Sequence, residues 1–170
     1  MCQTMINNTW FFKNECPIRM VSFEVHVLEI IDRFRQRKYY SQLESCGILM
    51  GEKRGLHGED IHVMHLSTPK ITDFRTPVYY KRGVHGHQDH LNQLHDSSQG
   101  RIQYLGEWHT HPQKYAKPSS TDYREWRKTC KYFKEQPVLF FIAGVHEDWL
   151  GIQKNEVLHL PTYFVNRGSY

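Results

Sequence analysis

The sequence lacks the features that mark membrane and secreted proteins. None of its apolar runs approaches the roughly 20 residues that a membrane-spanning helix needs. The N-terminal stretch also lacks the arrangement of basic, apolar and small residues that is typical of a signal peptide. We therefore expect a protein of the cytoplasm that has no membrane partner.

Cysteine is scarce, and charge of one sign forms no dense block. The four cysteines show no CxxC spacing, so in a cytoplasmic protein we expect them to be free thiols. They are Cys2, Cys16, Cys46 and Cys130. The net charge is +4, and the lysines and arginines are spread along the chain. Because nucleic-acid-binding domains gather basic residues on one face, this distribution does not indicate a nucleic-acid partner.

The chain does contain enough apolar residues for one core. Hydrophobic residues make up 39% of the 170 residues and aromatic residues 14%, a composition typical of a globular protein. No internal repeat or low-complexity segment is visible. We therefore expect one domain that spans residues 1–170.

The order of apolar and polar residues predicts an α/β fold with a mixed sheet. Residues 138–143 form a continuous apolar run, typical of a central strand buried on both faces. Helices are expected from Phe23 to Tyr39, with Ser22 as the cap, and over residues 82–98. Two prolines favour a loop over residues 68–80. The remaining expectations are strands over 18–23, 44–51, 61–66, 102–108 and 149–152, an edge strand or tail over 157–165, and an edge segment over 1–17 with exposed aromatics at 10–12.

Two histidines stand at the end of the strand expected over residues 102–108. Alternate side chains of a strand share a face, so His109 and His111 point the same way, about 6.5–7 Å apart. Pro112 then ends the strand, because it has no N–H group for the ladder. Such a pair can converge on one metal ion, although His-x-His pairs are common and indicate little by themselves.

A helix begins a few residues later, at residues 119–122 (SSTD). This tetrad fits a capping box, so one interpretation is that Asp122 only caps the helix. Helical spacing also places Asp122 on the apolar stripe, where a carboxylate is costly unless it is paired or bound to a metal. The stripe continues with Trp126, Thr129, Cys130 and Phe133. We therefore predict that His109, His111 and Asp122 bind Zn²⁺ and leave the fourth position open, as a catalytic zinc site requires.

Such a site needs a base for the proton of water, and Glu44 offers one at the entrance to the buried strand around residues 48–50. By itself, Glu44 could equally be a solvated residue at a strand end. Glu107 lies on the same strand face as the histidines, so it is either a rival base or a partner that orients them. Cys46 lies two residues from Glu44, which leaves a redox or inhibitory role of its thiol open.

Glu44, the His109-x-His111 pair and the Ser119-x-x-Asp122 pair together resemble the motif of the JAMM (MPN-plus) metallopeptidase family. The resemblance covers a motif core from about residue 40 to about residue 152. It implies the fold of that family, a cytidine-deaminase-like mixed sheet wrapped by helices, with zinc at a strand end. It also implies that Ser119 donates a hydrogen bond to the oxyanion while Glu44 transfers the proton.

A narrower resemblance rests on residues 106–112 (GEWHTHP) and 118–122 (PSSTD). These look like the compact bacterial JAMM deconjugases encoded with CBASS anti-phage operons. The resemblance implies an isopeptidase that removes a cyclic-dinucleotide synthase, linked through its extended C-terminal tail, from target proteins. Alternatives are a JAMM peptidase for another ubiquitin-like or sulfur-carrier protein, a non-catalytic MPN scaffold, or a DNA-repair-associated relative. The oligomeric state stays open.

Four further histidines gather in the expected helix over residues 82–98. They are His85, His87, His90 and His95. Only Asp89 stands at a helical step that matches them, which is too few acidic partners for a convincing second metal site. We therefore expect these histidines to have a structural or surface role.

Overall fold

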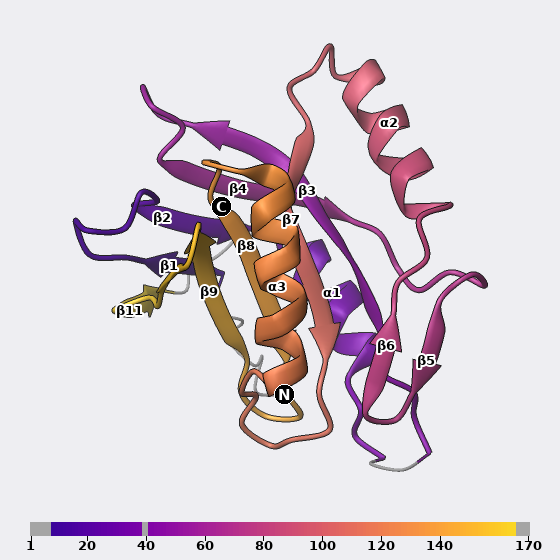
Figure 1. Ribbon diagram of the computed structural model, residues 1–170. Coiled ribbons are helices and arrows are strands. Elements are labelled where there is room, and N and C mark those ends of the chain that lie inside the picture. Colours follow the sequence, from indigo (N-terminus) through magenta and orange to yellow (C-terminus); the bar gives the residue numbers. More distant parts are fainter. Residues whose placement is uncertain (1–7, 39–40, 166–170) are drawn as a thin grey trace, which may run out of the picture.

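The computed structural model describes residues 8–38 and 41–165 and confirms the α/β fold (Figure 1). Nine strands form one mixed sheet in the order β10-β9-β8-β7-β3-β4-β2-β1-β11. They are β1 (Thr9–Phe11), β2 (Met20–Phe23), β3 (Cys46–Arg54), β4 (Asp60–Leu66), β7 (Gln103–Thr110), β8 (Val138–Ala143), β9 (Trp149–Lys154), β10 (Val157–His159) and β11 (Tyr163–Val165). The other elements are the hairpin of β5 (Phe74–Thr76) and β6 (Tyr79–Lys81) and the helices α1 (Val25–Phe34), α2 (His87–Ser97) and α3 (Ser120–Phe133). None of the helices in these residues is long and apolar enough to cross a membrane.

The sheet curls until its two edges come close together. β10 and β11 stand at opposite ends of the strand order, yet only residues 160–162 separate them in sequence. Because one residue spans at most about 3.6 Å, the steps from residue 159 to residue 163 bridge no more than about 14 Å. The edge strand expected over residues 157–165 is therefore two short strands: β10 pairs with β9, and β11 pairs with β1.

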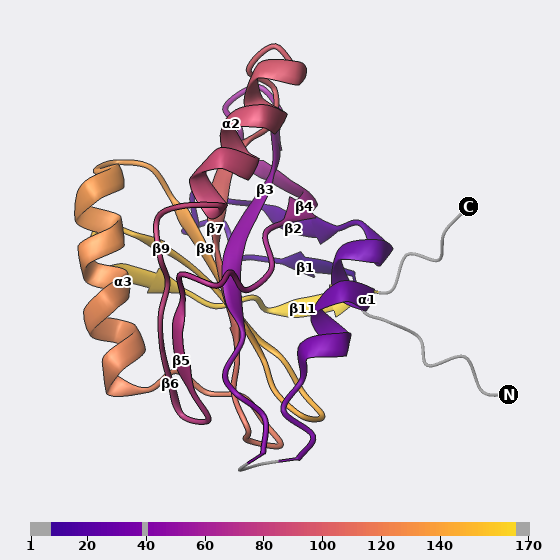
Figure 2. The ribbon, with the colours of Figure 1, turned by 90° about the vertical axis from the view of Figure 1, so that its right-hand side faces the viewer.

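Helices α1 and α3 cover opposite faces of the sheet, and Figure 2 shows the strands between them. Ile31 of α1 and Phe141 of β8 belong to one hydrophobic cluster. Trp126 of α3 and Phe140 of β8 belong to another. Neighbouring residues of β8 thus face different cores, which confirms that residues 138–143 form a strand buried on both faces.

The first helix is shorter than expected, and its predicted cap is wrong. It begins after Glu24 and ends at Phe34, while Tyr39 lies outside the described residues. Ser22 belongs instead to β2, where its hydroxyl lies 2.7 Å from Nδ1 of His62 on the parallel strand β4. That contact occupies the hydroxyl that would have been needed to cap α1.

Three other expectations about the fold are also wrong. The aromatic run at residues 10–12 is not exposed: Trp10 is buried and packs edge-on against Phe23, with ring centroids 5.3 Å apart. Residues 68–80 are not only a loop, because they contain β5 and the start of β6, which form a hairpin. The second helix starts only at His87, so Arg82 lies between the hairpin and α2. This hairpin brings side chains to the site described next.

Candidate metal centre

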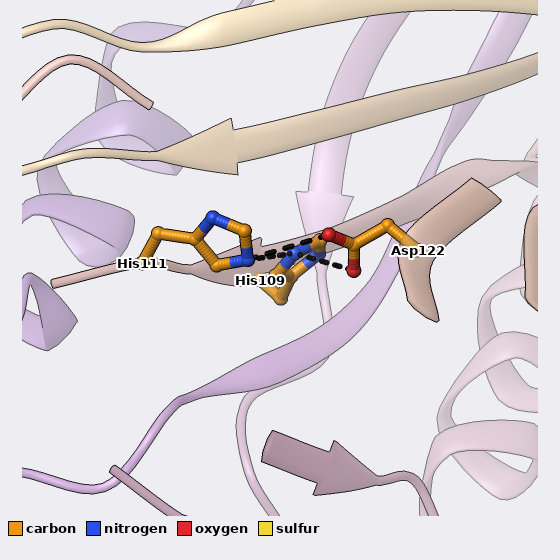
Figure 3. A group of neighbouring side chains, drawn as sticks. All are labelled: His109, His111 and Asp122. Carbon is orange, nitrogen blue, oxygen red and sulfur yellow. Dashed lines mark hydrogen bonds and ion pairs between the residues drawn. The ribbon is translucent and has the colours of Figure 1, made fainter. Parts of the chain in front are cut away.

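The C-terminal end of β7 and the N-terminal end of α3 meet at three buried side chains, drawn in Figure 3. Nε2 of His109 lies 3.1 Å from Nε2 of His111 and 3.2 Å from Oδ1 of Asp122. Nε2 of His111 lies 3.5 Å from Oδ2 of Asp122. The topology explains the meeting: α3 connects the parallel strands β7 and β8, so it must begin at the sheet edge where β7 ends.

These donor atoms fit a zinc ion. Tetrahedral bonds of about 2.0–2.1 Å place ligand atoms about 3.3 Å apart, close to the separations of 3.1, 3.2 and 3.5 Å. Two imidazoles and one carboxylate are also a donor set that zinc accepts with a fourth position open. Within residues 8–38 and 41–165, this is the only group of three or more His, Cys, Asp or Glu side chains placed to hold a metal ion.

The protonation states of His111 and Asp122 suit metal binding. Burial, assisted by the neighbouring His109, lowers the pKa of His111 to about 4, so its imidazole is neutral at pH 7. Burial raises the pKa of Asp122, but hydrogen bonds with His109 and Ser119 outweigh it and hold that pKa well below its usual range. A neutral imidazole and an ionised carboxylate are the forms that bind a cation.

Asp122 also caps α3 through a reciprocal pair with Ser119. The N–H and the hydroxyl of Ser119 both donate to Oδ2 of Asp122 at 2.6 Å. The N–H of Asp122 donates back to Oγ of Ser119 at 3.2 Å. The predicted capping box is therefore confirmed. Capping does not prevent metal binding, because Oδ1 of Asp122 still faces His109.

Glu44 stands across the site on the segment that leads into β3. Its Oε1 lies 3.8 Å from Nε2 of His111, and its side chain is buried. Burial, followed by the charge of Asp122, raises the pKa of Glu44 to about 8. A carboxyl group whose pKa lies near ambient pH can both accept and return a proton. Glu44, His111, Ser119 and Asp122 line the same cavity of about 520 Å³.

Glu107 lies on the histidine face of β7 but is engaged elsewhere. Its Oε1 accepts hydrogen bonds from Nη2 of Arg82 at 2.9 Å and from the hydroxyl of Tyr104 at 3.2 Å. Among the contacts of the described residues, none joins Glu107 to His109 or His111. Glu107 is therefore a poor rival base, because Arg82 and Tyr104 hold its carboxylate away from the two histidines.

The sequence-based prediction missed both Tyr80 and Arg82, because it assigned Tyr80 to a loop and Arg82 to the start of the second helix. The hydroxyl of Tyr80 lies 3.5 Å from Nδ1 of His109, and the two ring centroids are 5.0 Å apart. Tyr80 thus packs against the ring of a proposed ligand. The aromatic pair Tyr79-Tyr80 after Pro77 was the available signal, since aromatic residues favour strands.

The three cysteines within the described residues carry no sign of reactivity. Cys16, Cys46 and Cys130 are free thiols, as predicted, and Cys2 lies outside the described residues. Cys46 pairs through its backbone with His109, but its Sγ lies 3.8 Å from Oδ2 of Asp73. Burial raises the pKa of Cys46 to about 12. Because the thiolate is the reactive form, the idea of a redox or inhibitory thiol loses its support.

The histidines around α2 have structural contacts. His87 is buried, with Nδ1 2.5 Å from Oγ of Ser67 and Nε2 3.1 Å from Oδ1 of Asp73. Nδ1 of His95 lies 3.0 Å from the carbonyl oxygen of Ile102. For these two residues the expected structural role is confirmed. Asp89 is occupied as well, because its Oδ2 accepts a hydrogen bond from the N–H of Gly86 at 3.1 Å.

Comparison with known proteins identifies relatives that match most of the chain. The family model described as prokaryotic homologs of the JAB domain matches residues 24–155. A protein of Escherichia coli (strain TW11681) named CD-NTase/cGAS isopeptidase is 34% identical over 151 residues, which cover 85% of this chain and 93% of that protein. A protein of the same name from Vibrio cholerae serotype O1 is 36% identical over 148 residues, covering 86% of this chain and 90% of that protein.

Solved structures share the fold at low sequence identity. A solution structure of a protein from Desulfitobacterium hafniense has a TM-score of 0.54 at 19% identity and covers 81% of this chain and 87% of that one. A solution structure of a protein from Salinibacter ruber has a TM-score of 0.50 at 19% identity, with 86% and 91% covered. At this identity the likeness concerns the fold alone.

Proposed function

Because this chain belongs to the prokaryotic JAB-domain family, we propose that it is a zinc-dependent isopeptidase that releases a CD-NTase from proteins to which its C-terminus is linked, in anti-phage defence. The observation that carries this proposal is the set of three metal-compatible side chains beside the buried carboxyl of Glu44. The names and the coverage of the two relatives support the choice of substrate. The complete ligand set also favours catalysis over a scaffold that has lost its metal.

In this proposal His109, His111 and Asp122 hold the zinc ion. The chemistry that zinc supplies when bound is the acidification of water, which makes a nucleophile available at neutral pH. Glu44 would accept a proton from the attacking water and return it to the leaving ε-amine of the target lysine. Without the metal, burial and the charge of Asp122 raise the pKa of Glu44 to about 8. A bound zinc cation would lower that pKa and favour the ionised form that accepts a proton.

Ser119 has a second task in the same proposal. Its hydroxyl would turn toward the carbonyl oxygen of the isopeptide bond, where negative charge develops during attack. That hydroxyl now donates to Oδ2 of Asp122 at 2.6 Å, and so does the Ser119 N–H. The N–H contact can persist when the hydroxyl turns, so Asp122 keeps a hydrogen bond and α3 keeps part of its cap.

We also propose that residues 1–170 act as one domain, because the sheet that carries the site continues from β1 to β11, well beyond the motif core. The free buried thiols Cys46 and Cys130 fit the reducing cytoplasm, where we place the reaction. The substrate would present an extended C-terminal tail to the cavity, and neither a nucleic acid nor a membrane is part of the proposal.

The direct test uses a CD-NTase from the same gene cluster, fused through its C-terminal tail to a fluorescent reporter. The wild-type protein should cut directly after the last residue of the tail, and a chelator or Glu44→Gln should stop the reaction. Ubiquitin chains serve as the alternative substrate. Efficient cleavage of ubiquitin chains without cleavage of the fusion would exclude the proposed substrate while leaving the hydrolase intact.

A further inference from the structure

The cavity lined by Glu44, His111 and Asp122, called the metal cavity below, has a second cavity beside it along β7. The metal cavity measures about 520 Å³ and the second cavity about 420 Å³. Arg82, Glu107 and Thr129 line both, so these three side chains form the boundary between them. The second cavity lies between α2 and α3, and Figure 1 shows β7 running between these two helices. The two cavities thus lie side by side along β7, and the first of them is lined by two of the proposed metal ligands, His111 and Asp122.

The second cavity is lined mainly by apolar and aromatic side chains. The rings of Tyr104 and Phe133 stack in parallel, with centroids 4.5 Å apart and an interplanar angle of 4°, and form a flat wall. Val84 and Tyr132 stand at the rim and are 72% and 81% exposed. The apolar lining consists of Ile48, Val84, Leu91, Tyr104, Tyr132 and Phe133. Exposed apolar residues around a hollow are typical of a surface that binds a partner.

The charged groups at the boundary are satisfied by one another. Arg82 and Glu107 form an ion pair at 2.9 Å, with side chains 24% and 10% exposed. The hydroxyls of Tyr104 and Thr129 add contacts to Oε1 of Glu107 at 3.2 and 3.4 Å. His87 also lines the cavity, but both of its ring nitrogens have partners. A charged ligand would therefore lose its hydration without gaining a free partner, whereas an apolar side chain would gain by burial.

The position of the second cavity along β7 sets its distance from the reaction. Glu107 and Tyr104 lie two and five residues before His109, which corresponds to about 7 and 17 Å along a strand. An extended tail advances about 3.4 Å per residue, so the boundary at Glu107 matches the second tail residue before the scissile bond and the apolar lining beyond it matches residues three to five. An extended segment is the occupant that can reach both neighbouring cavities.

We propose that the second cavity binds one large apolar or aromatic side chain of the substrate tail, three to five residues before the scissile bond. This inference rests on the proposed isopeptidase function and names the determinant by which the enzyme recognises the tail. A tail with Leu, Phe, Tyr or Trp in that window would be a good substrate. A tail with Asp or Lys throughout the window would be a poor one.

The kinetic test places charge at the rim. Val84→Glu combined with Tyr132→Glu changes two exposed side chains, and Leu56→Glu, at a site 95% exposed and outside both cavities, is the matched control. With the CD-NTase tail fusion, the double variant should raise KM about 10- to 100-fold, the range expected when one apolar side chain is no longer buried. Its kcat should stay within about twofold, and the control should match the wild type.

An alanine scan of the last six tail residues, measured with the wild type and the double variant, locates the contact. Alanine at one of positions three to five before the scissile bond should lower kcat/KM with the wild type. The same substitution should cause little further loss of kcat/KM with the double variant, because both changes remove the same interaction. Fully additive effects at every position, or coupling confined to the last two residues, would overturn the proposal.

A binding measurement separates this proposal from the proposed function. N-acetyl-phenylalanine amide is titrated at millimolar concentration into zinc-loaded protein, with N-acetyl-aspartate amide as the charged counterpart, and amide chemical shifts are followed by NMR. Shifts around Tyr104 and Phe133 that occur only with the phenylalanine probe, and vanish in the double variant, support the cavity even if no CD-NTase fusion is cleaved. Shifts elsewhere, or none, would overturn it even if the fusion is cleaved.

Discussion

Oε1 of Glu44 and Nε2 of His111 face each other at a distance of 3.8 Å. This separation is too long for a direct hydrogen bond, which usually measures about 2.7–3.2 Å between a nitrogen donor and an oxygen acceptor. Both side chains are buried and line the same cavity. This distance suits a general base. Glu44 lies close enough to accept a proton from a water molecule held beside His111, and it does not itself take the place of a proposed metal ligand.

Zinc content should follow the three proposed ligands. Elemental analysis of the purified protein should find about one zinc per chain, and His109→Ala or Asp122→Ala should reduce it to background, because two remaining ligands bind weakly. His85→Ala is the matched control, since His85 is exposed and lies outside the cluster. Zinc that persisted in both ligand variants would place the metal elsewhere.

Glu44→Gln should separate chemistry from metal binding. The amide cannot accept the proton of water, so turnover should fall at least about 100-fold, the lower range for general acid–base catalysis. Zinc content and the circular dichroism spectrum should stay unchanged. Glu29→Gln on α1 is the control and should retain full activity. Unchanged turnover in Glu44→Gln would mean that another group is the base.

Stability of the zinc-free protein should depend on pH through Glu44. Its pKa is raised from 4.5 to about 8 in the folded state, so the folded protein binds an extra proton between these values. The free energy of unfolding should therefore rise by about 1.5 kcal/mol as the pH falls from 8 to 6.5. Below pH 6.5 the lowered pKa of His111, about 4, acts in the opposite direction, because the unfolded chain then binds the additional proton.

Urea titrations of the wild type and of Glu44→Gln, both in chelator, measure this effect. The difference between the two proteins isolates the carboxyl group, since every other titrating group is shared. Zinc should flatten the wild-type curve, because a nearby cation stabilises the ionised carboxylate. Parallel curves for the two zinc-free proteins would contradict the raised pKa of Glu44.

Ser119→Ala should affect both stability and turnover. Loss of the capping hydroxyl should lower the free energy of unfolding by about 1 kcal/mol. Loss of an oxyanion donor should lower kcat about 100- to 1,000-fold. Ser120→Ala, one residue later and exposed, is the control for both measurements. A stability loss with normal kcat would reduce Ser119 to a capping residue.

The sequence by itself determined the core of the site, because the relevant patterns are local. Alternation along a strand places His109 and His111 on one face, and their Nε2 atoms lie 3.1 Å apart. The capping box fixes Asp122 in the first turn of α3, with its side chain inward. The continuous apolar run at residues 138–143 is likewise a local signal for a strand buried on both faces.

The tertiary structure alone decided which other groups surround the proposed metal ligands. The hairpin β5–β6 brings Tyr80 to His109 and places Arg82 where it pairs with Glu107, contacts between residues 25 or more positions apart. The curl of the sheet sends the two halves of residues 157–165 to opposite edges. Single-sequence periodicity reports which face of an element is apolar, but not which distant element packs against that face. The second cavity depends on where α2 and α3 flank β7, so its position could not be read from spacing along the chain.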